Sequence, residues 1–302
     1  MNWFLLALIA PLAWSIANYI DKFILSRSEN NEGGSGGLMA LSSLVSLIVV
    51  IGIFVFSGYA VFSLDSHNIF ILILSGIFEA LYILFYFWAL ERESTTTVIS
   101  LFQFSPIMGL IFGYILLREI PSPMQIFAVV LILIGALCII WKKNESLSLK
   151  KNVLFLMLVS TAFVGIYTTL FKLVAEQTPF WTSIFWQYLG IVCVGLALFM
   201  FVPKYRKQTV YMIGKRTIFA TTLAEVMNIV ALLATNMAIL FAPVALVLSI
   251  SSVQPIFVLI EGFIIIALFP KLLDKSERPT LALHYLLGIL LVCLGGFLIY
   301  IF

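Results

Sequence analysis

Charged residues are scarce in this sequence. Lys, Arg, Asp and Glu together make up 10% of its 302 residues, whereas hydrophobic residues make up 63% and the mean hydropathy is +1.15. A soluble domain needs far more charge to cover its surface. The composition therefore excludes an ordinary soluble protein and indicates an integral membrane protein.

Histidine and cysteine are also few. The two histidines, His67 and His284, lie far apart, and Cys138, Cys193 and Cys293 lie in apolar segments without a CxxC pair. This pattern does not favour a disulfide framework or a zinc site. The sequence has no HExxH motif, no P-loop and no clustered acidic pair, and its loops are too short for a nucleotide-binding domain. We therefore predict that the protein is not an enzyme, needs no cofactor and is not an ATP-driven pump by itself.

Ten apolar segments account for nearly the whole chain. A helix needs roughly 20 apolar residues to span a hydrocarbon core about 30 Å thick. Each span is expected to be helical, because lipid offers no hydrogen-bond partner to the backbone N–H and C=O groups. The predicted spans are 3–25, 38–62, 68–90, 95–117, 122–141, 152–175, 180–202, 217–240, 243–269 and 281–302. The first has no basic start and no cleavage site, so it is expected to be a retained helix. Polar loops are expected at 28–37, 203–216 and 270–279, with a connector at 142–151.

The basic residues are distributed unevenly between the two sides of this predicted topology. Loops after even-numbered spans carry only Arg118 and Lys172. Loops after odd-numbered spans carry Lys22, Arg27, Arg92, Lys142, Lys143, Lys150, Lys151, Lys204, Arg206, Lys207, Lys215, Arg216, Lys271, Lys275 and Arg278. Positively charged loops stay in the cytoplasm, so this bias predicts that both termini lie outside. Topology and lipid headgroups explain the net charge of +3, and no nucleic-acid partner is expected.

The second half of the sequence repeats the first. The segment VISLFQFSPIMGLIFG (98–113) aligns without gaps to VLSISSVQPIFVLIEG (247–262), so that Pro106 falls on Pro255. Lys22 corresponds to Lys172, and Gly135 near the end of span five corresponds to Gly295 near the end of span ten. Five helices is an odd number, so the second half would enter the bilayer from the opposite side. This arrangement is an inverted repeat, which is typical of alternating-access transporters.

The predicted fold class is thus an all-α integral membrane protein of ten transmembrane helices in two inverted five-helix repeats. The first repeat is expected at 1–141, the connector at 142–151 and the second repeat at 152–302. The substrate site of such a protein lies near the bilayer midplane between the repeats.

The segment LLREIPSPMQIFAVVLILIGAL (116–137) resembles the junction of helices four and five in EamA-type transporters of the drug/metabolite transporter superfamily. The family pattern runs roughly G-E-x-x-S-x-x-Q-x-x-G-x-x-L-I-x-x-G, and its matches here are Glu119, Ser122, Gln125, Ile132 and Gly135. Arg118 and Ala128 replace two of its glycines. Trp14 and Lys22 in the first helix also fit the opening of this family, so the resemblance covers the whole chain.

The resemblance implies a ten-helix, 5+5 transporter, but it disagrees with the charge bias on one point. Members of this family usually keep both termini in the cytoplasm, whereas the basic residues here favour termini outside. Compact loops and the lack of a targeting segment are expected of a multi-pass protein in a bacterial or archaeal cytoplasmic membrane.

Polar residues inside the spans are the candidates for function, because they are costly in lipid and tend to face a wet cavity. In span three, Glu79, Tyr82 and Tyr86 share one helical face. In span eight, Asn228 is the repeat partner of Glu79, and Glu225 lies one turn earlier. We predict that these residues contact substrate or, for the carboxylates, exchange protons. Structural bonds to neighbouring helices are the competing interpretation for both carboxylates.

Spans one and six carry a second corresponding set. Trp14, Asn18 and Lys22 lie at successive turns of span one, and Thr168 and Lys172 form the corresponding set in span six. Trp14 fits either a cavity wall or the aromatic belt at the membrane interface. Each lysine either extends to the headgroups or pairs with an acid or an anionic substrate group.

Spans four and nine contain the predicted helix bends. Gln103 precedes Pro106, and Ser252 and Gln254 lie beside Pro255. Proline frees a carbonyl group that a nearby side chain or water has to satisfy. Interruptions at matching places in two halves point to a transport site, although ordinary kinks give the same pattern. Glu261 in span nine has no acidic repeat partner, and it is a candidate for ion pairing or coupling.

The function expected from these features is a secondary transporter or exporter of a small organic metabolite by alternating access, with the lipid bilayer as its surroundings and a proton as candidate coupling ion. One alternative is a flippase for a lipid or lipid-linked sugar, in which Lys22 or Lys172 would bind the phosphate. A second alternative is an uncoupled exchanger.

Overall fold

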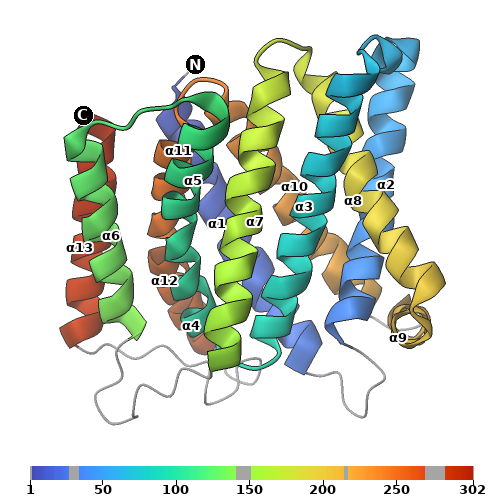
Figure 1. Ribbon diagram of the computed structural model, residues 1–302. Coiled ribbons are helices and arrows are strands. Elements are labelled where there is room, and N and C mark those ends of the chain that lie inside the picture. The colour runs from blue at the N-terminus through green and yellow to red at the C-terminus, as the bar shows by residue number, and fades with distance from the viewer. Residues whose placement is uncertain (1, 27–33, 141–150, 214–216, 269–282, 302) are drawn as a thin grey trace.

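The computed structural model describes residues 2–26, 34–140, 151–213, 217–268 and 283–301, and these form helices joined by short connections (Figure 1). No strand occurs in these ranges. Residues 142–150 of the predicted connector 142–151, residues 28–33 and 214–216 of the predicted loops 28–37 and 203–216, and the whole predicted loop 270–279 lie outside them. The helices run roughly parallel or antiparallel, and α1 begins at the same end of the bundle at which α13 ends.

The helix bounds follow the predicted spans closely. The helices are α1 (Trp3–Ser26), α2 (Ser35–Ser57), α3 (Ser66–Leu90), α4 (Thr95–Leu101), α5 (Ser105–Phe112), α6 (Pro123–Ile140), α7 (Lys151–Ala175), α8 (Phe180–Phe201), α9 (Pro203–Ile213), α10 (Thr217–Ile239), α11 (Val244–Ile250), α12 (Gln254–Leu268) and α13 (Leu283–Ile301). Short 3-10 segments η2 (Gly58–Phe62), η3 (Phe102–Phe104) and η5 (Ser251–Val253) and the π-helical turn η4 (Gly113–Leu117) lie between them.

Eight of the helical stretches in the described ranges are long and apolar enough to cross a membrane. They are Trp3–Ser26, Ser35–Phe62, Ser66–Leu90, Thr97–Leu117, Lys151–Ala175, Phe180–Phe201, Thr217–Ile239 and Val244–Leu268. The other two predicted spans coincide with α6 and α13, which contain the shorter apolar stretches Pro123–Gly135 and Leu283–Leu298. The protein is therefore a multi-pass helical membrane protein.

Two of the spanning stretches are interrupted in the same way. In the first half, α4, η3 and the start of α5 follow one another, and in the second half α11, η5 and the start of α12 do so. Under the ungapped alignment of 98–113 with 247–262, the bounds of these elements coincide residue for residue. Pro106 cannot donate to the Phe102 carbonyl, and the Ser105 hydroxyl bonds that carbonyl instead. The helix breaks thus occur where the sequence predicts bends.

Two predicted loops are wrong in part, and the errors have a common cause. Residues 203–213 form the helix α9 instead of a basic loop, and residues 35–37 belong to α2. A Cβ atom on Gly36 would overlap the ring of Tyr205, and one on Gly37 would lie 2.5 Å from Cβ of Gln208. The glycines therefore let α2 and α9 pack closely, and this tertiary contact fixes two segments whose composition is typical of loops.

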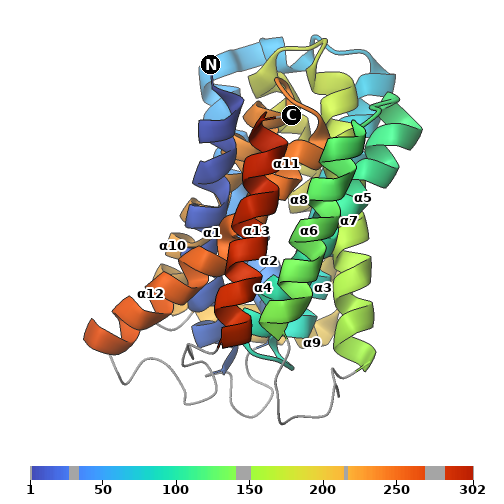
Figure 2. The same ribbon diagram turned by 90° about the vertical axis from the view of Figure 1, so that its left-hand side faces the viewer.

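The two halves of the chain interlock along most of the bundle. α1 packs against α10 and α12, α2 against α8, and α3 against α7 and α8. α6 and α13 form a separate pair at one edge, and Figure 2 shows α12 slanting away from them. A Cβ atom on Gly135 would lie 2.7 Å from the Gly288 carbonyl oxygen, and one on Gly295 would lie 2.8 Å from that of Ala128. The corresponding glycines of the repeat thus both lie at the crossing of α6 and α13.

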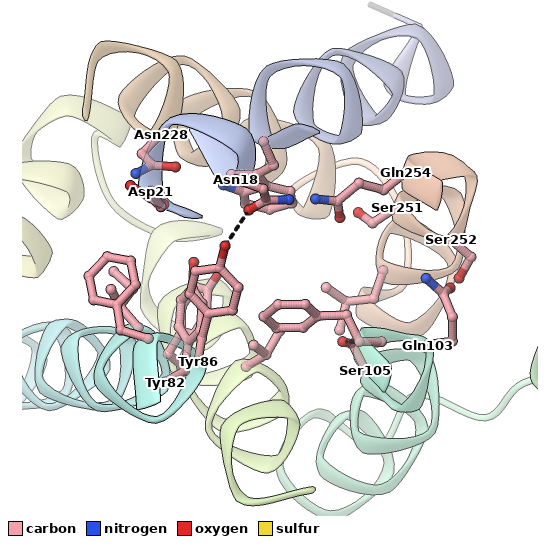
Figure 3. Close-up of a pocket in the computed structure, with 17 residues that line it drawn as sticks. Asn18, Asp21, Tyr82, Tyr86, Gln103, Ser105, Asn228, Ser251, Ser252 and Gln254 are labelled. Carbon is pink, nitrogen blue, oxygen red and sulfur yellow. Dashed lines mark hydrogen bonds between the residues drawn. The ribbon is translucent and has the colours of Figure 1, made fainter. Parts of the chain in front are cut away.

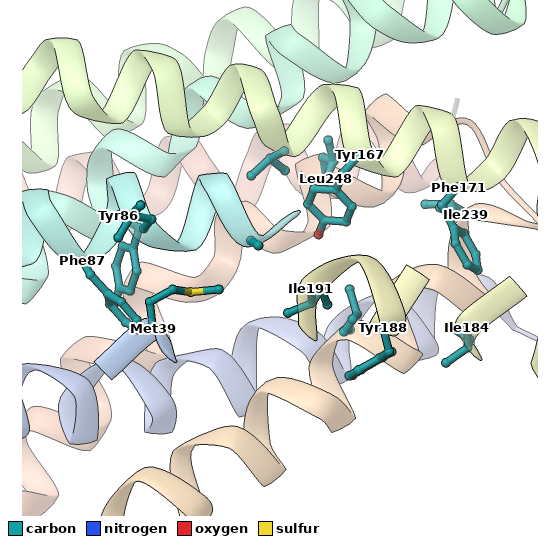
Figure 4. Close-up of a cluster of buried hydrophobic side chains, with 14 of the residues drawn as sticks. Met39, Tyr86, Phe87, Tyr167, Phe171, Ile184, Tyr188, Ile191, Ile239 and Leu248 are labelled. Atoms are coloured by element: carbon teal, nitrogen blue, oxygen red, sulfur yellow. The ribbon is translucent and has the colours of Figure 1, made fainter. Parts of the chain in front are cut away.

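The largest apolar cluster lies between the halves (Figure 4). Met39 and Phe87 come from the first half, whereas Tyr167, Tyr188 and Ile239 come from the second, and all five are buried. Inside a bilayer the hydrophobic effect contributes little to helix association, so close packing of helices through small residues is important there. Gly76 and Gly190 provide it where α3 crosses α8, since a Cβ on either would overlap backbone atoms of the other helix.

The turn before α6 explains the motif that resembles the EamA-type pattern. Ser122 and Gln125 form a reciprocal capping box, in which the Ser122 amide donates to Gln125 Oε1 (2.8 Å) and the Gln125 amide donates to Ser122 Oγ (3.2 Å). Arg118, which replaces a glycine of the pattern, has a left-handed backbone with φ of 58°. Glycine adopts that conformation without steric cost, so the pattern reflects a real backbone requirement at this position.

Candidate functional site

A cavity lies between the halves at the level of the two helix breaks (Figure 3). The empty space among its lining residues is about 680 Å³, including the part that opens to the outside. The lining comes from α1, α3, η3, α5, α7, α10, α11, η5 and α12. The lining therefore comes from both halves of the chain.

Eight of the candidate residues from the sequence line this cavity. They are Trp14, Asn18, Tyr82, Tyr86, Gln103, Asn228, Ser252 and Gln254. They come from five separate stretches of the chain, and the fold brings them to one place. Glu79, Glu225, Thr168, Lys172 and Glu261 do not belong to the lining.

Aromatic rings form one wall of the cavity. Tyr82 stacks on Tyr167 with ring centroids 5.4 Å apart, and Phe102 meets Tyr82 edge-on at 6.3 Å. Tyr86 lies 5.4 Å from Phe102, and its hydroxyl donates to Asn18 Oδ1 over 2.8 Å. Trp14 also lines the cavity and is half-buried. Its placement agrees with the cavity-wall interpretation.

Neutral polar groups form the end of the cavity beside the helix breaks. Gln103, Ser251, Ser252 and Gln254 gather there, as Figure 3 shows. Four buried polar atoms of the lining have no hydrogen-bond partner in the described part of the chain. These atoms are Nδ2 of Asn18, Oε1 of Gln103 and the hydroxyl oxygens of Ser251 and Ser252. Buried polar groups normally have partners, so this end is suited to a polar ligand or to water.

Asp21 lies at the other end of the cavity, beside Asn228 (Figure 3). Its side chain is buried, with 3% exposure. The sequence interpretation missed it, although a signal was present. Asp21 follows Asn18 by three residues and Trp14 by seven, which places all three on one helical face.

Glu79 faces α8 instead of the cavity. Its Oε2 accepts a hydrogen bond from Nε2 of Gln187 (2.8 Å), and Oε1 of Gln187 accepts one from Nδ2 of Asn236 (2.6 Å). All three side chains are buried, with at most 3% exposure. The sequence indicated neither Gln187 nor Asn236 as a partner of Glu79, because no local spacing connects α3, α8 and α10.

Glu225 lies one hydrogen bond behind the cavity wall. Its Oε1 accepts from the hydroxyl of Ser46 (2.7 Å), and its Oε2 accepts from Nδ2 of Asn228 at 3.5 Å, which is long. Asn228 itself lines the cavity. This carboxyl is therefore closer to the cavity lining, through its partner, than Glu79 is.

Lys172 pairs with an acid, as one of the two interpretations from the sequence expects. Its Nζ lies 2.7 Å from Oε1 of Glu119 and donates to the Ala242 carbonyl over 2.8 Å. Oε2 of Glu119 accepts from the Val244 amide at 3.0 Å. Glu119 belongs to the first half and the other three residues to the second, so this cluster ties the halves together beyond one end of the cavity.

Lys22 has a related but different arrangement. Its Nζ donates to the carbonyl oxygens of Leu90 and Glu93, at 2.8 Å each. Under the repeat alignment Glu93 corresponds to Ala242, so both lysines bind the same carbonyl of the connection between the third and fourth helices of their half. These two bonds of Lys22 join residues of the first half.

The remaining candidates lie in structural positions. Thr168 is fully buried and donates to the Val164 carbonyl of its own helix (2.7 Å). Glu261 accepts from the Ser15 hydroxyl through Oε1 (2.7 Å). Its Oε2 is buried without a hydrogen-bond partner in the described ranges. No group of three or more His, Cys, Asp or Glu side chains in those ranges could hold a metal ion.

Comparison with known proteins identifies a transporter family. Residues 1–141 match the model of the EamA-like transporter family. No curated protein matches the sequence. Among solved structures 28 chains match, and one crystal structure of a protein covers 98% of this chain and 96% of its own, with a TM-score of 0.59 and 15% sequence identity. At that identity the likeness concerns the fold alone.

The family match confirms the resemblance that the motif at 116–137 indicated. It covers the residues predicted as the first five-helix repeat. The apolar helices agree with this match, since both indicate a multi-pass membrane protein.

Proposed function

We propose that this chain, whose residues 1–141 match the EamA-like transporter family, moves a small organic metabolite across the membrane by alternating access. The transporting unit would be two inverted five-helix repeats, with α6 and α13 as the fifth helix of each. The identical order and bounds of the elements in the two interrupted helices support this repeat.

The observation that carries the proposal is the cavity between the halves. It is lined by polar and aromatic side chains from both halves, and it lies at two matching helix breaks. Discontinuous helices at the interface of inverted repeats form the substrate sites of many secondary transporters. The eight candidate residues in the lining are therefore proposed as substrate contacts.

The cluster of Lys172 and Glu119 is the proposed closure at one end. It joins the two halves through a largely buried ion pair, with side-chain exposures of 8% and 17%. An alternating-access cycle has to open and close each end in turn, so this pair would break when that end opens. Lys22 at the other end donates to the carbonyls of Leu90 and Glu93.

Proton coupling is a further part of the proposal. Intramembrane carboxyl groups form proton relays in many transporters. Glu225 is the first candidate here because its partner Asn228 lines the cavity, whereas Glu79 is held by Gln187 away from it. A lipid flippase is less well supported, because the two lysines that would bind a phosphate are engaged with Glu119 or with backbone carbonyls.

The orientation in the membrane remains as the charge bias predicts, with both termini outside. Under this proposal the end with Lys172 and Glu119 faces outward, and the end with Arg92, Lys151 and Lys204 faces the cytoplasm.

The test is the sidedness of access to the cavity. A variant with Cys138, Cys193 and Cys293 replaced by Ser receives one cysteine at Ser252, and a membrane-impermeant maleimide is added to either side of oriented vesicles. We expect labelling from the Lys172 end to be slow and to rise severalfold when Glu119→Gln is added. Arg118→Asn is the matched control, because it removes the neighbouring exposed charge and Asn tolerates the left-handed backbone.

Equal labelling from both sides, unchanged by Glu119→Gln, would contradict alternating access through this cavity. A protein that is labelled only from the end with Lys172 would reverse the assignment of the closed end.

A further inference from the structure

Asp21 is a buried acid that lines the cavity. Its side chain is 3% exposed, and it has no hydrogen bond or ion pair with any residue in the described part of the chain. The neighbouring Lys22 does not neutralise it, because that side chain extends to the carbonyls of Leu90 and Glu93. The buried end of the cavity therefore contains an acid that no cation of the described residues pairs with.

The surroundings of Asp21 strengthen its preference for a cation. Glu225 lies within electrostatic range of Asp21, and no Lys, Arg or His in the described ranges lines the cavity. An isolated buried carboxylate is costly unless it pairs with a positive charge. A cation that enters from solution can provide that charge, and it would interact with both acids.

The aromatic wall adds a second interaction of the same kind. Trp14, Tyr82, Tyr86, Phe102 and Tyr167 all line the cavity. The faces of such rings carry negative charge density and attract organic cations, and the attraction is greater where water is excluded. The same rings provide an apolar surface for the body of the molecule.

The opposite end of the cavity is polar but carries no charge among the described residues. The hydroxyls of Ser251 and Ser252 at this end, and Asn18 Nδ2 between the two ends, lack partners among the described residues and could bond a hydroxyl or carbonyl group. A carboxylate there would have no basic side chain to pair with. The two ends thus differ in chemistry, with an acid at one and neutral polar groups at the other.

We propose that the cavity binds organic amines in their protonated form, with the ammonium group beside Asp21 and the apolar body against the aromatic wall. This inference rests on the proposed function and names the substrate class for the same cavity. A carboxylate on the same molecule weakens binding, since it brings an anion into a cavity that contains Asp21 and lies beside Glu225.

Binding of matched probes to the purified full chain tests the inference. Phenethylamine, phenylalanine and 2-phenylethanol share one aromatic body and differ in charge, and butylamine lacks the ring. Isothermal titration calorimetry at neutral pH, where both amines are protonated, gives the Kd of each. We expect phenethylamine to bind at least about tenfold more tightly than 2-phenylethanol, because a charge-assisted hydrogen bond contributes that much or more. Phenylalanine should bind more weakly than phenethylamine.

Variants of Asp21 test the position of the ammonium group. Asp21→Asn should weaken phenethylamine at least about tenfold and leave 2-phenylethanol unchanged, whereas Asp21→Glu should keep measurable amine binding. Asp65→Asn is the matched control, since Asp65 lies outside the cavity at the start of α3 and Asn is also a good N-cap. It should bind phenethylamine as the unaltered protein does.

Three results would overturn the inference. They are equal amine affinity in Asp21→Asn and the unaltered protein, tighter binding of phenylalanine than of phenethylamine, and no binding of either amine. The measurement needs no transport, so its failure is separate from that of the proposed function. Sided labelling at Ser252 without amine binding would leave alternating access supported and reject only the substrate class.

Discussion

Nζ of Lys172 lies 2.7 Å from Oε1 of Glu119, and the two residues belong to opposite halves of the chain. The same ammonium group donates to the Ala242 carbonyl, and the same carboxylate accepts from the Val244 amide. The pair therefore replaces most of the water that both groups would bind in solution. Removal of one partner of such a pair is costly, because the charge of the other partner stays partly buried without compensation.

Removal of either partner should lower stability. We expect Glu119→Gln and Lys172→Met each to reduce the free energy of unfolding by about 3 kcal/mol. The double variant should lose less than the sum, with a coupling of about 1–3 kcal/mol, because residues in direct contact are not additive. Unfolding equilibria in mixed micelles measure all four proteins. Additive losses would mean that the pair does not form.

Gln187 connects three helices through its amide. Gln187→Leu should lower the free energy of unfolding by about 2–4 kcal/mol, because it leaves Glu79 without its donor and Asn236 without its acceptor. Gln177→Leu is the matched control, because Gln177 is exposed after the end of α7. Thermal unfolding in detergent compares the two. Equal melting temperatures would show that the network of Gln187, Glu79 and Asn236 contributes little.

Gly76 allows α3 and α8 to approach closely. Gly76→Ala should destabilise the fold by about 3 kcal/mol or more, because the added Cβ would overlap the Gln187 backbone and neither helix can give way without losing packing. Gly52→Ala in α2 meets nothing within 4 Å and should be neutral or stabilising by up to about 1 kcal/mol. Thermal unfolding of the two variants in parallel decides this. A stable Gly76→Ala variant would contradict the crossing.

Asp65 caps the first turn of α3 and makes one part of the stability depend on pH. Its carboxylate accepts from the amides of Asn68 and His67, both at 3.0 Å, and these hydrogen bonds lower its pKa below the ordinary 3.8. Because the pKa is lower in the folded state, the stabilisation is complete above the ordinary pKa and is lost as the pH falls through the folded value.

A pH series on two proteins tests this cap. Between about pH 6 and about pH 3, the melting temperature of the unaltered protein should fall relative to that of Asp65→Asn, whose cap does not titrate. A constant difference across the series would mean that the carboxylate is not bonded in solution.

The fold could be predicted from the sequence where one apolar segment makes one helix. The predicted span 68–90 corresponds to α3 (Ser66–Leu90), and the helices break near Pro106 and Pro255, where bends are predicted. These features depend on local chemistry. The length of an apolar segment decides whether it spans the membrane, and proline lacks the backbone N–H that would continue a helix. α9 and the start of α2 depend on each other through Gly36 and Tyr205, and a local pattern does not contain such a contact.

The part of the candidate site that depends on local helical spacing was also predictable from the sequence. Helical spacing placed Tyr82 and Tyr86 on one face, and both line the cavity. Glu79 shares their face of the helix, but it lies about one to two turns away from them along α3, where Gln187 of α8 reaches it. Its partner was not predictable because only the packing of α8 decides which polar group reaches a buried acid. Asp21 was predictable from its spacing to Asn18 and was overlooked beside the more conspicuous Lys22.

The ion pair of Lys172 and Glu119 has an energetic consequence for an empty transporter. In the proposed cycle this pair joins both halves and breaks when its end opens. Without cargo, opening of that end would lose the pair with no new contact in return. Contacts with the cargo would have to offset that loss, so solutes that fit poorly would leave the barrier in place and the membrane would not leak.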